Sequence, residues 1–183
     1  MHSPLFTLLR GSWDFTRVIL AARAEPLSVR GSAAFTPEGA ASLRYTERGV
    51  LQAAAAGPPL DVRAEHEWRF PPAAEPAAGD SASVYFPDGR FFHAVALPPP
   101  AAAGEREARF THQCDPDTYE GSLALDAGGA RMRLRWRVTG PRKDSTIETH
   151  FVKRAEGAGA AADEGRGGGG GGGAPAGACP SGC

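Results

Sequence analysis

The chain has 183 residues, 42% of them hydrophobic, and a formal net charge of -1 at pH 7. This length suits one ordinary domain, and the small charge gives no reason to expect nucleic acid or a membrane as a partner. The sequence contains no run of about 18 apolar residues, the length that a membrane-spanning helix requires. The N-terminus lacks the pattern of a secretory signal, and the three cysteines make an odd count. We therefore expect a cytoplasmic protein in a reducing compartment.

Composition divides the chain into a patterned part and a tail. Residues 4–154 carry alternating hydrophobic and polar positions, whereas residues 155–183 contain a long glycine run. A glycine run cannot offset the entropy lost on ordering, so we expect a disordered tail after one folded domain. Cys179 and Cys183 in this tail are too few to complete a zinc site, and the sequence leaves their role open.

Within the domain, hydrophobic residues recur at every second position, which is the pattern of β-strands. The one helical candidate is the short segment SPLFTLLRG before the first strand. The expected strands are 12–20, 27–36, 42–52, 60–70, 82–86, 91–97, 105–114, 119–125, 131–139 and 144–153. Ten short strands with hairpin-length links favour an all-β fold, a single antiparallel up-and-down barrel that removes the sheet edges.

Turn residues set the register of two hairpins. The pair Asp88-Gly89 tolerates a tight two-residue turn, which places Val84 opposite His93 and Phe86 opposite Phe91. Residues 115–118 read as a four-residue turn with aspartate first and proline second.

The four-residue turn places Cys114 opposite Tyr119 and His112 opposite Gly121. These four residues of the hairpin then lie on one face of the sheet.

Two later turns agree on which face is the interior. The Gly128-Gly129 turn places Gly121 opposite Trp136, and the loop at 140–143 places Trp136 opposite Ile147. The same register pairs Glu120 with Arg137 on the other face, a favourable cross-strand charge pair. The arginine-rich strand at 131–137 is therefore expected to carry a solvated outer face rather than a nucleic-acid groove.

Extending the alternation to the earlier strands turns several polar residues inward. They are Arg17, Tyr45, Glu47, His66, His93, His112 and Tyr119. A barrel of this strand number can enclose a ligand instead of being filled by side chains. A buried guanidinium without a partner costs on the order of several kcal/mol, so Arg17 requires Glu47, a ligand carboxylate or water.

A series of short motifs resembles a known family. The segments are GSWDFTR, GSAAF, LRYTERG, FPDGRFFH, HQCDPDTY and WRVTGPRKD, and together they resemble the domain-of-unknown-function family numbered 6314 over roughly residues 8–154. The Gly-x-Trp opening is also similar to that of the lipocalin and fatty-acid-binding (calycin) barrels. That resemblance implies that Trp13 closes one barrel end, under an arginine for which Arg142 and Arg154 are the candidates. His66 stands where the family more often carries an aromatic residue, so the resemblance assigns it no site role.

Three kinds of chemistry compete at the inward polar residues. His93, His112 and Cys114 could form a zinc or iron set, although their spacing along the strands is loose. Cys114 beside His112 is similar to a nucleophile with its base, but no oxyanion-hole segment precedes it. His150 is the positional candidate for a haem ligand, yet the register turns it outward. The sequence therefore assigns no metal and leaves any cofactor unknown.

The sequence best supports a barrel that binds a small polar or carboxylated molecule in its lumen. Arg17 would hold an anionic group, and the expected ligand-binding residues are Arg17, Tyr45, Glu47, His93, His112, Cys114, Tyr119 and Trp136. The alternative is a small non-metal isomerase, lyase or hydrolase that uses His93 or His112 as general base with Tyr119 or Glu47 as acid. A third reading is a scaffold whose lumen is filled by aromatic side chains.

Overall fold

The computed structural model describes residues 3–52, 58–71, 80–99 and 104–155, which form one short helix and ten antiparallel strands. The elements are α1 (Pro4–Leu9), β1 (Gly11–Ala21), β2 (Leu27–Pro37), β3 (Ser42–Gln52), β4 (Leu60–Arg69), β5 (Asp80–Tyr85), β6 (Phe91–Leu97), β7 (Arg106–Cys114), β8 (Asp117–Leu125), β9 (Arg131–Thr139) and β10 (Asp144–Lys153). Each strand begins and ends within two residues of its predicted range. The predicted all-β, up-and-down barrel with a short N-terminal helix is confirmed.

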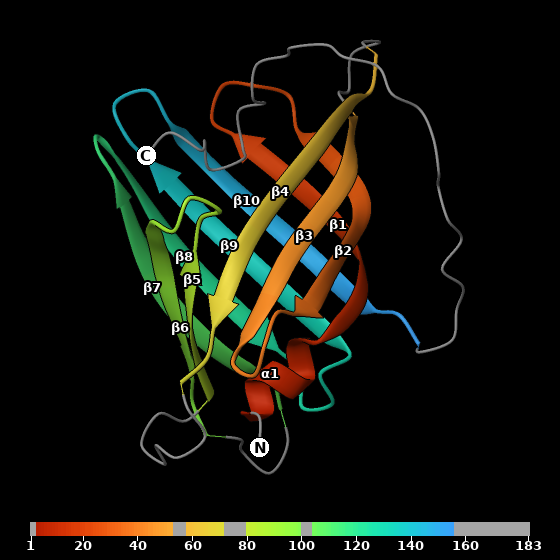
Figure 1. The fold of residues 1–183 in the computed structure, drawn as a ribbon. Helices are drawn as coiled ribbons and strands as arrows, with labels where there is room; N and C mark the ends of the chain where they lie inside the picture. The colour runs from red at the N-terminus through yellow and green to blue at the C-terminus, as the bar shows by residue number, and fades with distance from the viewer. Residues whose placement is uncertain (1–2, 53–57, 72–79, 100–103, 156–183) are drawn as a thin grey trace.

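The strands form one sheet that curves around a common interior (Figure 1). Their hydrogen-bonded order is β6-β5-β4-β3-β2-β1-β10-β9-β8-β7, so the first strand pairs with the last. β6 and β7 stand at the two ends of this order and contact each other. We call the line between β6 and β7 the seam. The barrel is nearly closed, and the seam is where its two outermost strands meet.

Side chains hold the seam together. Arg106 on β7 forms an ion pair with Asp80 on β5, and both side chains are almost fully buried. His112 Nδ1, also on β7, lies 2.8 Å from the main-chain carbonyl oxygen of Phe92 on β6. Because a carbonyl only accepts, Nδ1 must carry a proton to make this hydrogen bond.

The helix α1 closes one end of the barrel. The side chain of Ser3 accepts a hydrogen bond from the Phe6 amide, and proline follows at the first helical position, which together begin the helix. Leu5, Phe6 and Leu9 are buried against the strands. Trp13 is fully buried beneath them and donates from Nε1 to the Leu9 carbonyl over 2.9 Å. We call this region the closed end.

The predicted arginine cover over Trp13 is wrong, because a lysine takes that place. Lys153 is the register partner of Trp13, and its Nζ lies 5.3 Å from the indole ring while donating to the Leu8 carbonyl over 2.7 Å. Arg154 instead pairs with Asp14 on the outer face. Arg142 lies in the β9–β10 turn, at the end of β10 away from Trp13.

The registers expected around β9 are confirmed. Gly121 lies opposite Trp136 and Glu120 opposite Arg137 in the β8–β9 ladder. Trp136 lies opposite Ile147 in the β9–β10 ladder. The interior face was therefore assigned correctly on the three strands that share these turns.

The predicted register of the β7–β8 hairpin is wrong by two residues. Cys114 lies opposite Asp117 and His112 opposite Tyr119, and Gly121 faces Phe110 rather than His112. β8 begins earlier than expected because Asp117 is held by Lys143, whose Nζ lies 2.6 Å from its carboxylate. A two-residue shift preserves the alternation of faces, so the inward set is unchanged.

A β-bulge changes the face of one residue in β6. Val84 lies opposite His93 as expected, but Tyr85 rather than Phe86 lies opposite Phe91, so Phe92 has no register partner in this hairpin. The extra residue turns Phe92 and His93 both inward. It leaves Phe91 exposed, whereas alternation from His93 would turn Phe91 inward. The bulge also leaves the Phe92 carbonyl free to accept the hydrogen bond from His112.

In the described part of the chain, no helix has both the length and the apolar character needed to cross a membrane. The predicted disordered tail lies outside the described residues apart from residue 155, and so do Cys179 and Cys183.

Candidate functional site

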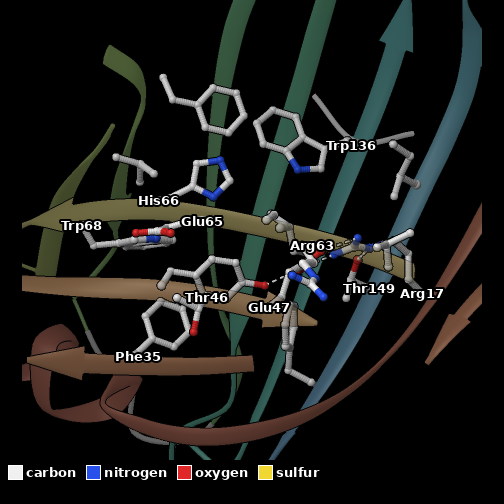
Figure 2. Close-up of a pocket in the computed structure, with 18 of the residues that line it drawn as sticks. Arg17, Phe35, Thr46, Glu47, Arg63, Glu65, His66, Trp68, Trp136 and Thr149 are labelled. Atoms are coloured by element: carbon white, nitrogen blue, oxygen red, sulfur yellow. Dashed lines mark hydrogen bonds and ion pairs between the residues drawn. The ribbon is translucent and has the colours of Figure 1, made fainter. Parts of the chain in front are cut away.

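A cavity of about 680 Å³ lies inside the barrel. This volume falls within the range of small-molecule sites, which are usually apolar with a few placed polar groups. Figure 2 shows polar side chains such as Arg17 and Glu47 on one side and the rings of Phe35 and Trp68 on the other. The aromatic side chains of the lining are Phe35, Tyr45, His66, Trp68, Phe86, Phe92, His93, Tyr119, Trp136 and Phe151.

A buried ion pair forms the polar side of the cavity. Arg17 on β1 donates from Nη1 and Nη2 to the two oxygens of Glu47 on β3, over 2.8 and 2.7 Å. Its Nε donates to Thr149 Oγ1 on β10 over 2.9 Å. Three strands thus contribute one network, which dashed lines mark in Figure 2. The pairing of Arg17 with Glu47, one of the options left open by the sequence, is the one observed.

The fourth member of the network is Tyr45, whose hydroxyl donates to Glu47 Oε2 over 2.5 Å. Burial and the Glu47 charge raise the pKa of Tyr45 well above its usual value, so the phenol keeps its proton. Burial is the largest single influence and would raise the pKa of Glu47, but the hydrogen bonds and charge of Arg17, together with the hydrogen bond from Tyr45, outweigh it and lower that pKa. At neutral pH the network therefore holds one cation, one anion and one neutral phenol.

Two histidines line the aromatic side of the cavity. The His66 ring on β4 stacks on Phe92 at 5.3 Å, and burial lowers the pKa of His66 to about 4. The His93 ring stacks on Phe110 at 4.1 Å, and burial together with the charge of His66 lowers the pKa of His93 to about 3. Both imidazoles are neutral at physiological pH. His93 Nδ1 is buried without a hydrogen-bond partner among the described residues.

The cavity reaches the surface at one edge of β4. In the described residues, β4 pairs with β5 only through residues 67–69, and the β5–β6 hairpin ends lower than its neighbours in Figure 1. The exposed residues Asp61, Arg63 and Glu65 of β4 line the cavity together with exposed Pro87 from the hairpin turn. We call this opening the mouth.

Tyr119 lines the cavity from β8 and is anchored from outside it. Its hydroxyl oxygen accepts a hydrogen bond from Lys143 Nζ over 3.0 Å, and the same ammonium lies 2.6 Å from Asp117. The hydrogen bond to Asp117, together with that to Tyr119, raises the pKa of Lys143. Asp117, which the sequence presents as a turn former, therefore begins β8 and fixes the β9–β10 turn.

His112 and Cys114 differ from the other predicted site residues, because neither is among the residues that line the cavity. His112 packs against the lining residue Phe92, with the two ring centroids 4.8 Å apart. Cys114 is half-buried at the end of β7. The reason is the bulge, which turns Phe92 inward and lets the stacked rings of His93 and Phe110 fill the space beside β7.

The structure also bears on the metal and haem alternatives. In the part of the chain that the structure describes, no three His, Cys, Asp or Glu side chains gather closely enough to hold a metal ion. His150, the positional haem candidate, lies on the exposed face of β10 with Nε2 2.8 Å from Glu148.

Thr149 and His66 are among the cavity residues that were not assigned a site role from the sequence. Thr149 is fully buried and bonds Arg17, and alternation from Ile147 would have placed it inward. His66 was placed inward by the same alternation. What the sequence lacked was any signal that β4 borders the mouth, which gives the polar residues of this strand access to the cavity.

The sequence matches the family of unknown function DUF6314 over residues 9–153. The chain belongs to this family. The matched range spans all ten strands of the DUF6314 barrel and includes the whole Arg17–Glu47–Tyr45 network, so the predicted resemblance is confirmed. No curated protein is similar enough in sequence to count as a match.

Solved structures resemble the DUF6314 barrel at low sequence identity. The S-type phycobiliprotein lyase CPES from Guillardia theta is 9% identical with a TM-score of 0.60, covering 82% of this chain and 90% of its own. Rv2717c from M. tuberculosis is 14% identical with a TM-score of 0.55, covering 85% of this chain and 100% of its own. These likenesses show a shared, calycin-like barrel fold.

Proposed function

We propose that this DUF6314 protein binds a small polar or carboxylated molecule in the barrel cavity. The observation that carries the proposal is the buried network of Arg17, Glu47 and Tyr45 in the wall of an otherwise aromatic cavity. A buried ion pair is seldom more stabilising than apolar residues of the same size. Fold stability alone therefore gives little reason for such a network, whereas orienting a ligand does.

Binding is better supported than the enzyme alternative. A general base works best when its pKa lies near the operating pH. Burial holds the pKa of His93 at about 3, so it is a weak base at neutral pH. His112, the other candidate base, does not line the cavity. His93 therefore suits hydrogen bonding to a ligand better than proton abstraction.

Native mass spectrometry of the purified full chain tests the proposal. Ala64 lines the cavity opposite Glu47, so Ala64→Phe should fill the space without removing a polar group. Thr16→Phe adds the same ring on the exposed face of β1 and serves as the control. We expect a bound small molecule in the wild type and in Thr16→Phe, and its loss in Ala64→Phe. Equal retention by Ala64→Phe would place the molecule elsewhere.

A further inference from the structure

We infer that the ligand of this cavity is a planar, uncharged molecule with hydrogen-bonding groups, and that Arg17 does not receive an anionic group. This inference rests on the proposed function and narrows it to one ligand class. It differs from the expectation drawn from the sequence, in which Arg17 holds a carboxylate.

Charge balance in the lining is the first argument. The described lining residues with fixed charges are three arginines and three carboxylates: Arg17, Arg48, Arg63, Glu47, Asp61 and Glu65. Three positive and three negative charges sum to zero. The inner pair is Arg17 with Glu47, and the other four belong to β3 and β4 near the mouth. An added anion would therefore find no excess positive charge to offset its loss of water.

The geometry at Arg17 is the second argument. Its planar guanidinium is matched by the two oxygens of Glu47, and its Nε is taken by Thr149. Two N–H groups remain, because a guanidinium has five donors. A ligand carboxylate that used them would lie beside the Glu47 carboxylate, and like charges at such a distance repel strongly inside a protein. A neutral carbonyl or ring nitrogen avoids that cost.

Ring geometry is the third argument. The rings of His66 and Phe92 are tilted by only 17°, and those of Phe92 and Trp136 by 19°, at centroid separations of 5.3 and 5.4 Å. The Phe92 ring on β6 is thus nearly parallel to one lining ring from β4 and to another from β9. Flat molecules contact aromatic faces over their whole area, whereas puckered rings touch at a few atoms.

Neutral imidazoles provide the fourth argument. His66 and His93 each offer one N–H donor and one lone-pair acceptor when uncharged. Both residues line the cavity. Uncharged donors and acceptors of this kind match carbonyl, amide or ring-nitrogen groups on a heteroaromatic molecule.

Three naphthalenes of equal size but different charge test the inference. The probes are 2-acetylnaphthalene, 2-naphthoate and 2-(aminomethyl)naphthalene, which are neutral, anionic and cationic at pH 7.5, each titrated into the full chain by calorimetry. We expect the ketone to bind at least about tenfold more tightly than either ion, because each ion loses its water without compensation. The decahydro analogue of the ketone tests planarity and should bind about tenfold more weakly than the ketone.

Variants at Glu47 sharpen the result. Glu47→Gln leaves the Arg17 charge unpaired, so it should raise the affinity for 2-naphthoate about tenfold relative to the affinity for the ketone. If this variant does not fold, Arg17→Met with Glu47→Met removes both charges of the inner pair, and 2-naphthoate should then gain no affinity relative to the ketone.

The outcomes separate this inference from the proposed function. Naphthoate binding as tight as the ketone in the wild type would overturn the inference and leave the binding function standing. An equal affinity for the decahydro analogue would overturn the planar part. Absence of binding for all four probes, together with no co-purifying molecule, would overturn the binding function itself.

Discussion

The closed end and the cavity are built from the same strands, but the closed end is filled by packed side chains and the cavity is not. Trp13 and Arg17 lie four residues apart on β1 and both face inward. Trp13 is fully buried, packs edge-on against Phe35 and Phe151, and satisfies its one donor on α1. Arg17 instead lines a cavity of about 680 Å³ and forms a buried ion pair with Glu47 there.

The difference shows how one barrel separates stability from binding. The closed end buries large side chains completely, so it supplies apolar burial and a fixed floor for the interior. The cavity lacks that packing and contains polar groups whose burial costs free energy. Changes at the closed end should therefore affect folding alone, while changes in the cavity should affect both folding and ligand.

Trp13→Ala should produce the largest loss of stability. Removing a fully buried tryptophan costs about 4 kcal/mol of unfolding free energy, since the site cannot collapse around the space left behind. Urea unfolding followed by circular dichroism measures this loss. Val152→Ala, at an exposed position of the neighbouring strand, should cost less than about 0.5 kcal/mol. A loss at Trp13 as small as the control's would show that the closed end is not the main source of stability.

Glu47→Gln should cost about 3 kcal/mol, because it leaves the Arg17 charge buried without its partner. The second change Arg17→Met should recover most of this loss in the double variant, since it removes the stranded charge. Glu38→Gln breaks the exposed pair with Arg44 and is the matched control, with an expected loss below about 0.5 kcal/mol. Equal losses in the two single variants would mean that the cavity pair is as solvated as a surface pair.

Acid should destabilise the protein through His66. Burial lowers the folded-state pKa of His66 from 6.5 to about 4, so between these values the unfolded chain binds the proton and the folded protein does not. Stability therefore falls as the pH drops from about 6.5 to about 4, by on the order of 2 kcal/mol once the solvent reaching this half-buried ring is allowed for.

His66→Phe should give a shallower decrease of unfolding free energy over this pH range. The decrease should not vanish, because the pKa of His93 is also lowered and it titrates in the same direction. Val152→Ala, at an exposed position of β10 that carries no titratable group, should leave the slope unchanged. A slope in His66→Phe equal to the wild type's would mean that His66 is protonated in the folded protein as readily as in the unfolded chain.

His112→Phe should have the smallest effect. It removes one hydrogen bond across the seam and leaves the Phe92 carbonyl without that donor, at a cost of about 1 kcal/mol. Because His112 does not line the cavity, affinity for the probe ketone should stay within about twofold. A large loss of affinity with unchanged stability would return His112 to the binding site that the sequence proposed for it.

Alternation alone predicted which way several residues of the cavity point. The period-two pattern turns Arg17, Tyr45 and Glu47 inward on two strands, and the need of a buried guanidinium for a partner gave Glu47 as one of three options, beside a ligand carboxylate and water. The turn at 128–129 and the loop at 140–143 fixed the position of Trp136. These features depend on local rules, namely turn chemistry and the two faces of a strand.

Other features depended on contacts between distant segments. The bulge at Phe92 cannot be read from the Asp88-Gly89 turn, and it removed His112 from the cavity and exposed Phe91. The two-residue shift of the β7–β8 hairpin follows from Lys143, which lies on another turn. The closeness of Lys153 to Trp13 follows from the β1–β10 register, which joins the two ends of the domain.

The amino-acid sequence by itself determined that this chain is an antiparallel barrel with a polar cluster inside, because every strand carries its own alternation. Only the tertiary structure decided which polar residues meet in one cavity and that Arg17 is already neutralised there. The physical reason is that faces are set by neighbouring residues, whereas bulges, registers and charge pairs are set by strands that meet from far apart in the chain.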